Sequence, residues 1–232
     1  MILRRWEDLP DFMKTQEVKP YYDILANKKI SLLLKRIFDF SVALVMLIVL
    51  IIPIVGITVW IKLDSHGPVF YRQERVTAYG KKFKIHKFRT MVSNADKIGS
   101  LVTISNDSRV TRSGRVLRRY RLDELPQLFD VLNGDMSFVG TRPEVVKYVE
   151  KYQPEFNATL LMPAGITSEA SIRYKDEDKL LSAANDVDKV YVEKVLPAKM
   201  VWNLKSVRRF RFLREMLTMF RTVLAVLGKD YN

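Results

Sequence analysis

The chain has 232 residues, enough for one domain with a sizeable hydrophobic core, with or without extensions. Its 39 lysines and arginines outnumber 26 aspartates and glutamates, and the formal charge of +13 favours an anionic partner: nucleic acid, an acidic membrane surface or a phosphorylated substrate. The absence of cysteine excludes a disulfide framework and a thiolate zinc site, and two histidines disfavour a histidine-rich metal centre. A metal would therefore have oxygen ligands, as Mg²⁺ does.

Residues 1–34 are mixed and polar, with prolines at positions 10 and 20, and we expect a short helical or irregular extension. The first residues carry charges where a signal peptide has an apolar region, so no cleaved export signal is predicted.

An apolar segment of 22 residues from Phe40 to Ile61 contains no charge. As a helix it would be about 33 Å long, enough to cross a hydrocarbon core of about 30 Å, and a buried core helix is the alternative. Pro53 should bend this helix. The flanking charges show no asymmetry, because four basic residues precede the segment and four follow it: Lys28, Lys29, Lys35, Arg36, Lys62, Arg72, Arg75 and Lys81. A re-entrant helix that enters and leaves on the cytosolic face satisfies both observations, whereas a kinked span satisfies the bend alone.

The rest of the chain predicts short alternating elements. Two strands are expected around a turn at Gly80, then a polar loop, two helices, a turn and further helical runs. The corresponding ranges are 69–76 and 83–90 for the strands, 94–115 for the loop, 122–133 and 143–152 for the helices, 163–167 for the turn, and 177–186 and 187–197 for the helical runs.

Residues 206–227 predict a basic amphipathic helix, with leucines, phenylalanines and a valine at helical spacing and five arginines between them. Such a helix suits an anionic membrane interface, and packing on the protein's own core fits the pattern equally well. The apolar segment elsewhere in the chain favours the interface.

Asp123 and Glu124 form an acidic pair between Arg118 and Arg142. Arginines that bind phosphate beside carboxylates able to hold Mg²⁺ are what phosphoryl transfer requires, because its main burden is to neutralise spread negative charge. An aspartate before an apolar run with proline in the first turn is also an ordinary helix N-cap. The spacing alone does not decide between these readings.

Five motifs decide the matter by resemblance. They are "KRIFD" (35–39), "GPVFYRQER" (67–75), "FKIHKFRTM" (83–91), "LDELPQLFDVLNGDMSFVG" (122–140) and "TRPE" (141–144). In order and spacing they resemble the bacterial sugar transferase family, the monotopic phosphoglycosyl transferases. The chain resembles a small member that consists of the catalytic unit.

The resemblance implies transfer of a sugar 1-phosphate from a UDP-sugar to polyprenyl (undecaprenyl) phosphate, the first membrane step of surface glycan biosynthesis. It implies that Asp123 attacks the sugar-bearing phosphate, releases UMP and forms a covalent phosphosugar-aspartate intermediate, while Glu124 is a ligand of Mg²⁺. Arg118, Arg142 and Pro143 are assigned by the same match to the substrate phosphate site.

The other matched positions carry weaker assignments. Lys87 and Arg89 are expected to line the phosphate site, and a solvated strand face is the alternative. Gln127 lies one helical turn after Asp123 and Asp130 about two, so either could bind substrate or order the acidic pair.

The resemblance also implies an architecture and a location. The expected fold is α/β, mostly helical with a small β-hairpin, in a monotopic protein on the cytosolic face of the bacterial inner membrane. Its expected parts are an extension (1–34), a re-entrant membrane helix broken at Pro53 (35–62), a cytosolic catalytic domain (63–200) and an interfacial amphipathic helix (201–232). The expected partners are the UDP-sugar, polyprenyl phosphate and membrane lipids, without nucleic acid, and a homodimer is compatible with this reading. The alternative function, a membrane-tethered basic module that binds nucleic acid or acidic lipid without catalysis, leaves the acidic pair unexplained.

Three departures from the family pattern stand out. Ile52 replaces the polar residue that commonly precedes the membrane proline, so the bend would depend on Pro53 itself. Thr141 replaces a proline of the "GPRP" pattern and preserves the arginine. The segment Ser168–Lys175 differs from the family's usual run, and we expect it to influence sugar or uridine recognition.

Overall fold

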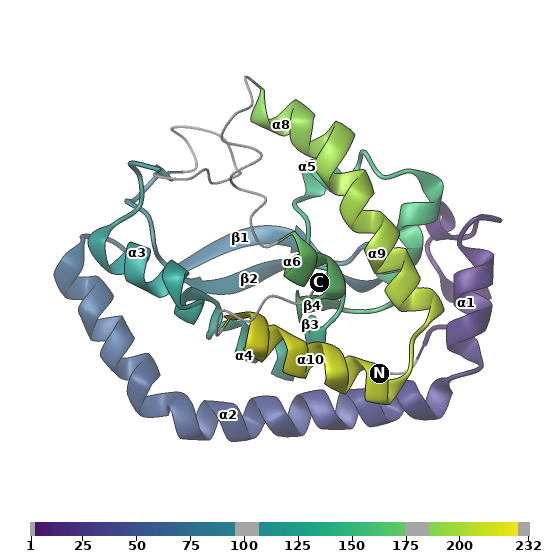
Figure 1. The fold of residues 1–232 in the computed structure, drawn as a ribbon, viewed down its shortest axis with the longest axis horizontal. Coiled ribbons are helices and arrows are strands. Elements are labelled where there is room, and N and C mark those ends of the chain that lie inside the picture. The colour runs from purple at the N-terminus through teal and green to yellow at the C-terminus, as the bar shows by residue number, and fades with distance from the viewer. Residues whose placement is uncertain (1–2, 96–106, 175–185, 227–232) are drawn as a thin grey trace.

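The computed structural model describes residues 3–95, 107–174 and 186–226. Within these ranges the chain is mostly helical and forms two small sheets of two strands each, which confirms the predicted class in outline. Figure 1 shows one long helix, α2, along one edge of the molecule, with the other labelled elements all on the same side of it.

The predicted membrane segment forms helix α2 (Lys29–Asp64), which has 36 residues and contains Pro53. Figure 1 shows the C-terminal part of α2 turning toward the side on which the rest of the chain lies. A proline inside a helix removes one backbone donor and crowds the preceding turn, so Pro53 supplies a physical cause for this bend.

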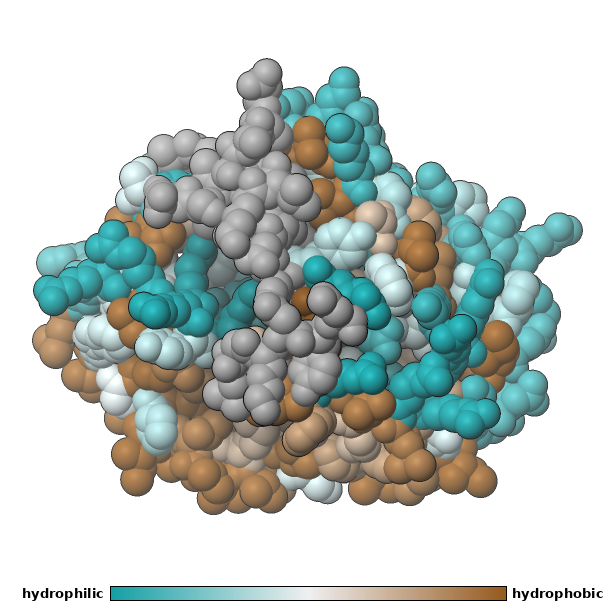
Figure 2. Space-filling model, viewed as in Figure 1, coloured by the Kyte–Doolittle hydropathy of each residue, from teal (hydrophilic) through white to brown (hydrophobic). Residues whose placement is uncertain are grey.

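Helix α2 exposes most of its apolar side chains. Its most apolar stretch is only 17% buried, and Figure 2 shows an apolar band along this edge of the molecule. A core helix would hide these side chains, so the alternative of a buried core helix does not fit the structure. The exposed large hydrophobic residues of α2 are Ile30, Leu33, Leu34, Ile37, Phe40, Leu44, Val45, Ile48, Val49, Ile51, Ile52, Val55, Val59, Trp60 and Leu63.

The N-terminal part of α2 is fixed to helix α4 (Gln127–Asn133) through Arg36. Its guanidinium donates from Nη1 to Val131 O at 2.6 Å and from Nη2 to Leu132 O at 2.9 Å. Carbonyls in the last turn of a helix have no partner within the helix, and a cation there also complements the helix dipole. Arg36 therefore holds α4, which follows the acidic pair, against α2.

Buried charges make a second connection between α2 and helix α10 (Phe212–Val226). Lys35 Nζ lies 2.9 Å from Glu215 Oε2, in a close charge contact that does not meet hydrogen-bond geometry. Asp39 lies one turn further along α2 and accepts a hydrogen bond of 2.7 Å from Ser137 Oγ. The three charged groups are buried, so they join α2, α10 and the strand that contains Ser137.

The predicted β-hairpin is present. Strands β1 (Phe70–Val76) and β2 (Lys82–Phe88) pair antiparallel, with Phe70 opposite Phe88 and Val76 opposite Lys82. The intervening turn, η3 (Ala78–Gly80), ends at Gly80 with φ of 73°, a conformation that glycine adopts without steric cost. The hairpin presents Lys87 toward the acidic pair.

The turn predicted at 163–167 is wrong, because most of it forms strand β4 (Ala164–Thr167), which pairs in parallel with β3 (Met136–Val139). The two strands are separated by a long stretch of sequence, so short-range patterns did not reveal their pairing. A β-carbon on Gly165 would lie 2.1 Å from Gly140 N. Glycine is therefore required where the two backbones approach.

The helices around the acidic pair differ from their predicted bounds. Helix α3 (Arg112–Arg119) lies at the end of the predicted 94–115 loop, whose residues 96–106 lie outside the described ranges. The predicted helix over 122–133 is a 3₁₀ turn, η5 (Leu122–Glu124), followed by α4. The predicted helix over 143–152 shortens to α5 (Val146–Val149) because the chain before it is extended.

The C-terminal region forms α8 (Val187–Val190), a short π-helical turn η7 (Tyr191–Val195) and α9 (Leu196–Arg208) before α10. The helical run predicted at 177–186 lies, except for its last residue, outside the described residues. The single amphipathic helix predicted over 206–227 is wrong in its bounds, because the chain breaks between α9 and α10.

The two faces of α10 reverse the usual arrangement of a globular protein. Its buried face is polar, with Glu215 and Thr218 only 6% and 4% exposed, whereas Leu213 and Phe220 are 78% and 60% exposed. A surface helix that packs on a core buries its apolar stripe. The apolar face of α10 therefore lies free, beside the exposed face of α2 (Figures 1 and 2).

The N-terminal segment is part of the main core, although the sequence suggested an appended extension. It includes helix α1 (Lys19–Ala26) and the 3₁₀ turns η1 (Trp6–Asp8) and η2 (Asp11–Met13). Its apolar side chains share one cluster with residues far beyond α2 in the sequence, from the 3₁₀ helix η6 (Pro154–Leu161) and from α9. The buried members from the N-terminal segment are Leu9, Met13, Val18, Tyr21 and Leu25.

Candidate active site

Asp123 and Glu124 lie in the 3₁₀ turn η5, in the sharp connection between α3 and α4. Just before this turn, Arg121 adopts a left-handed conformation with φ of 57°. A non-glycine residue seldom takes this conformation, and such strain often accompanies functional sites. Arg121 reverses the direction of the chain after α3. The two carboxylates therefore come directly after this reversal.

Glu124 accepts hydrogen bonds from two cations. Lys87 Nζ and Arg142 Nη2 both lie 2.9 Å from Glu124 Oε1, one from strand β2 and the other from the extended segment before α5. Burial raises the pKa of Glu124, but these two cations outweigh that effect and lower the pKa well below its usual range. Glu124 is therefore ionised at neutral pH, and its contacts hold three separate parts of the chain together.

Asp123 has a different environment from its neighbour. It is only 9% exposed, and its carboxylate makes no hydrogen bond with any part of the chain that the structure describes. Burial, and then the charge of Glu124, raise its pKa, while Lys87 and Arg118 oppose the shift. The N-cap reading of Asp123 is wrong, because α4 begins after Pro126 and has no side-chain cap.

Arg118 lies at the end of α3 and brings a third cation to the pair. Its Nε donates to Thr90 Oγ1 at 2.8 Å, which fixes the side chain against the end of the hairpin. Burial lowers the pKa of Arg118, and the negative charge of Asp123 opposes that shift. The guanidinium remains charged, because arginine is effectively always protonated in proteins.

Two other residues assigned from the sequence have partners elsewhere. Arg89 donates to Ser65 O at 2.7 Å and to His66 O at 2.9 Å, and so joins the end of β2 to the end of α2. Asp130 accepts from the backbone N–H of His86 at 2.9 Å and lies 2.6 Å from its ring Nδ1, which connects α4 to β2. Gln127 is buried in the first turn of α4. Arg89 and Asp130 therefore fix the positions of the elements around the site, and their hydrogen bonds are not to the acidic pair.

Arg75 is a supporting residue that the sequence analysis treated only as a flanking charge. It lies on β1 with Gln73 on the same strand face, and its Nη1 donates to Pro143 O at 3.1 Å while Nη2 donates to Gln73 Oε1 at 2.6 Å. Pro143 is itself buried and follows Arg142 directly. Arg75 therefore holds the segment that presents Arg142, and strand alternation in "RQER" was the signal that could have identified it.

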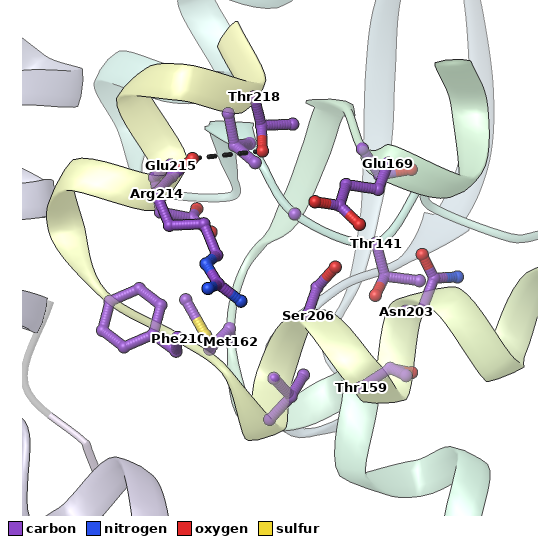
Figure 3. A pocket seen from close by; sticks show the side chains of 14 residues that line it. Thr141, Thr159, Met162, Glu169, Asn203, Ser206, Phe210, Arg214, Glu215 and Thr218 are labelled. Atoms are coloured by element: carbon purple, nitrogen blue, oxygen red, sulfur yellow. Dashed lines mark hydrogen bonds between the residues drawn. The ribbon is translucent and has the colours of Figure 1, made fainter. Parts of the chain in front are cut away.

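A cavity begins beside this segment. Its lining includes Thr141, the neighbour of Arg142, together with Ser168 and Glu169 at the start of α6 (Glu169–Arg173), and Asn203 and Ser206 of α9. Figure 3 shows the Glu169 carboxylate and the Ser206 hydroxyl directed toward the same space. Two residues of the predicted recognition segment, Ser168 and Glu169, thus line this cavity, and Lys175 lies outside the described residues.

The acidic pair offers oxygen ligands of the kind that Mg²⁺ prefers. No group of three acidic or histidine side chains that could hold a metal occurs within the described residues. Mg²⁺ in phosphoryl-transfer sites is commonly held by one or two carboxylates together with substrate phosphates and water. The adjacent carboxylates of Asp123 and Glu124 fit this arrangement. Both hydrogen bonds to Glu124 are accepted by Oε1, so Oε2 remains for a metal ion.

Comparison with known proteins gives a consistent answer. The family model described as "Bacterial sugar transferase" matches residues 30–229, which confirms the resemblance found in the motifs. A Bacillus subtilis (strain 168) protein, provisionally named undecaprenyl-phosphate N-acetylgalactosaminyl 1-phosphate transferase, is 43% identical over 149 residues, covering 64% of this chain and 82% of the relative. The UDP-glucose:undecaprenyl-phosphate glucose-1-phosphate transferase of Escherichia coli (strain K12) is 41% identical over 159 residues, covering 67% of this chain and 34% of the relative. The exopolysaccharide production protein PSS of Rhizobium leguminosarum bv. phaseoli is 40% identical over 150 residues, covering 62% of this chain and 75% of the relative.

Proposed function

Because this chain belongs to the bacterial sugar transferase family, we propose that it transfers a sugar 1-phosphate from a UDP-sugar to undecaprenyl phosphate or a similar polyprenyl phosphate. The observation that carries the proposal is the unequal environment of two adjacent carboxylates. Glu124 is bound to Lys87 and Arg142, whereas Asp123 is left without a hydrogen-bond partner among the described residues. A carboxylate that must attack phosphorus needs such freedom.

The proposed reaction has two steps. A carboxylate oxygen of Asp123 bonds to the sugar-bearing phosphorus, and the bond from that phosphorus to the bridging oxygen breaks, so UMP leaves with the bond's electron pair. An oxygen of the polyprenyl phosphate then bonds to the same phosphorus, and the bond to Asp123 breaks. The carboxylate is regenerated, and the product is a polyprenyl diphosphate sugar. Neither step needs a strong base, because a carboxylate and a phosphate are both ionised near neutral pH.

The surrounding cations reduce the repulsion between the Asp123 carboxylate and the substrate phosphate as the two approach. Lys87, Arg118 and Arg142 come from three different elements and surround the pair. Fixed positive charge of this kind stabilises the spread negative charge of a phosphoryl transition state. Mg²⁺, when bound at Glu124, would add charge neutralisation at the phosphate oxygens.

The proposed topology is monotopic, with α2 re-entering the membrane rather than spanning it. The segment before α2 and the elements after it share one hydrophobic core, so both must lie on the same side of a membrane. The bent α2 and the exposed face of α10 would be the parts in lipid, and the site would face the cytosol, where nucleotide sugars are found. This arrangement retains the proposed parts: the N-terminal segment 1–34, the membrane helix 35–62, the catalytic region 63–200 and the interfacial region 201–232. A location at the inner membrane follows from the lipid acceptor.

The cavity beside Thr141 is the proposed place of sugar recognition. Its hydroxyl and amide groups, from Thr141, Asn203 and Ser206, suit the hydroxyls of a sugar, and Thr141 precedes the proposed phosphate ligand Arg142. Hydrogen-bonding sites of this kind discriminate strongly between substrates because an unmatched buried polar group is costly.

A donor screen tests the proposed function. The purified full-length protein in neutral detergent micelles would be given each of several UDP-sugars, with and without undecaprenyl phosphate, in Mg²⁺ buffer, and UMP release would be followed. We expect one or a few donors to release UMP at a rate that depends on the acceptor, and the product to be a lipid diphosphate sugar. Absence of UMP release with every donor, combined with salt-sensitive DNA binding, would favour the basic binding module instead.

A further inference from the structure

A cationic cleft lies between α6, α9 and α10, apart from the acidic pair. It encloses about 660 Å³, part of which is open solvent. Five basic side chains line it against one carboxylate, Glu169. The basic residues are Arg173 of α6, Lys205 and Arg209 at the end of α9, and Arg214 and Arg221 of α10.

The cleft is separate from the proposed phosphate-transfer centre. Neither it nor the adjoining cavity of Figure 3 includes Asp123, Glu124 or Lys87 in its lining. The two hollows share Glu169, Ser206 and Arg214 at their boundary. The five cations of the cleft are therefore unexplained by the transfer reaction, and five converging positive charges repel one another unless an anion is present.

The cleft also meets the exposed apolar face of α10. Leu217 lines the cleft and is itself exposed, and the exposed Leu213 and Phe220 lie one turn away on either side of it along α10. In Figure 2, hydrophilic residues lie directly above the apolar band in the region of α9 and α10. A ligand in the cleft would therefore have its charged part among the basic side chains and apolar surface immediately beside it.

Trp202 adds a further feature of a membrane interface. The Arg173 guanidinium lies 3.9 Å from the centre of its ring, and Lys205 Nζ lies 4.5 Å from it. Tryptophan is enriched at the level of lipid headgroups, because its ring is apolar and its N–H is polar. The Trp202 ring, which belongs to α9, thus contacts two of the five cations that line the cleft.

We propose that this cleft binds the phosphate headgroup of an anionic membrane phospholipid. The arginine side chains would donate forked hydrogen bonds to the phosphate oxygens, and the acyl chains would lie along the apolar face of α10. Charge complementarity and continuity with the apolar face identify the occupant as a lipid rather than a soluble anion. The inference rests on the proposed membrane placement of α10, and no step of the proposed transfer reaction depends on it.

The test compares lipid retention by the full-length protein in neutral detergent micelles. Equimolar phosphatidylglycerol and phosphatidylcholine would be added, and the bound lipid would be counted by native mass spectrometry. The test variant is Arg209→Gln with Arg221→Gln, since both side chains are exposed and one directly follows α9 while the other lies on α10. The matched control is Lys29→Gln with Lys62→Gln, which removes two positive charges from exposed positions near the ends of α2.

We expect the unmodified protein to retain phosphatidylglycerol in preference to phosphatidylcholine. The cleft variant should lose this preference by roughly tenfold to thirtyfold, because each cation near an anionic headgroup contributes about a fivefold attraction. The control pair should change it by less than about threefold. Equal retention of the two lipids by the unmodified protein, or equal losses in the two variants, would overturn the proposal, because either result indicates diffuse attraction.

Two soluble anions complete the experiment. Inorganic phosphate or UDP, each added at millimolar concentration, should leave the bound phosphatidylglycerol in place. Displacement by phosphate would assign the cleft to free phosphate, and displacement by UDP would assign it to the donor nucleotide; either result overturns the lipid assignment. Lipid retention is measured without donor or acceptor, so a failure of UMP release in the donor screen and a failure of this proposal remain distinguishable.

Discussion

Lys87 Nζ donates to Glu124 Oε1 at 2.9 Å, and it makes no hydrogen bond to the adjacent Asp123 among the described residues. The contact joins the β-hairpin to the turn between α3 and α4. Arg142 donates to the same oxygen, so the positive charge is gathered on one carboxylate of the pair. Adjacent residues of similar chemistry thereby acquire opposite pKa shifts, lowered for Glu124 and raised for Asp123.

Asp123→Asn should reduce UMP release by at least about a thousandfold, because an amide cannot attack phosphorus and regenerate as a carboxylate does. A brief incubation of the unmodified protein with donor alone should yield a protein species heavier by one sugar phosphate, and this species should be absent from the variant. The matched control is Asp135→Asn, an aspartate paired with Lys81 on the loop after α4. Normal turnover in the Asp123 variant would exclude it as the nucleophile.

Lys87→Gln should move the acid side of the pH profile for kcat/KM to higher pH. Burial and Glu124 raise the pKa of Asp123 while Lys87 opposes the rise, so removing the cation raises that pKa further and protonates the nucleophile at a higher pH. The maximal rate should also fall by about a hundredfold as one stabilising cation is lost. Lys84→Gln, at an exposed position on the same strand, should leave the profile unchanged. A shift toward lower pH would contradict the placement of Lys87.

Glu124→Gln should raise the Mg²⁺ concentration needed for half-maximal UMP release by at least tenfold, because a carboxylate ligand is replaced by a weaker donor. The variant also gives a readout without catalysis. The folded-state pKa of Glu124 is lowered, so its stabilising contribution is present above its unfolded pKa of about 4.3 and is lost as pH falls through the folded pKa. The difference in Tm between the unmodified protein and the variant should therefore be full at pH 7 and shrink in acid; a difference that grew in acid would refute this account.

Glu215→Ala should lower the free energy of unfolding by up to about 3–5 kcal/mol, because it removes the nearer of the two carboxylates that pair with the buried Lys35 and leaves only Asp39, at 3.6 Å. The Lys35→Met/Asp39→Asn/Glu215→Leu triple variant should recover most of that loss, since it removes all three buried charges and nearly keeps the volume. Thermal unfolding of each variant in micelles, monitored through the release of α10, would measure these changes in the free energy of unfolding. Equal destabilisation by the single and triple variants would show that the buried charges are not the cause.

Single cysteines test the topology, and the absence of native cysteine makes each label unique. Arg5→Cys and Lys151→Cys lie before and after α2, and both should resist a membrane-impermeant maleimide in intact cells while reacting in lysates. The physical reason is the core shared by the chain on the two sides of α2. Labelling of Arg5→Cys alone in intact cells would establish a transmembrane span.

The local elements of this protein could largely be predicted from sequence, because their signals are short in range. Neighbouring residues alone reveal the long apolar segment 40–61, the alternation in the hairpin strands and the acidic pair in "LDELP". The pairing of β3 with β4 was not readable, because it depends on the close backbone approach of Gly140 and Gly165, which are far apart in sequence. The N-cap reading of Asp123 failed for a related reason: the left-handed Arg121 and the 3₁₀ turn shifted the start of α4.

The sequence by itself determined the composition of the site: a strongly basic chain, an acidic pair, and motifs that identify the family. Only the tertiary structure decided how those residues divide their roles. It gathered Lys87 and Arg142 onto Glu124, directed Arg89 and Asp130 to structural contacts, and brought Arg75 behind the segment that presents Arg142. It also turned the polar face of α10 inward, where Glu215 pairs with the buried Lys35 of α2. Ion pairs between distant elements depend on the three-dimensional path of the chain, and sequence periodicity contains no record of that path.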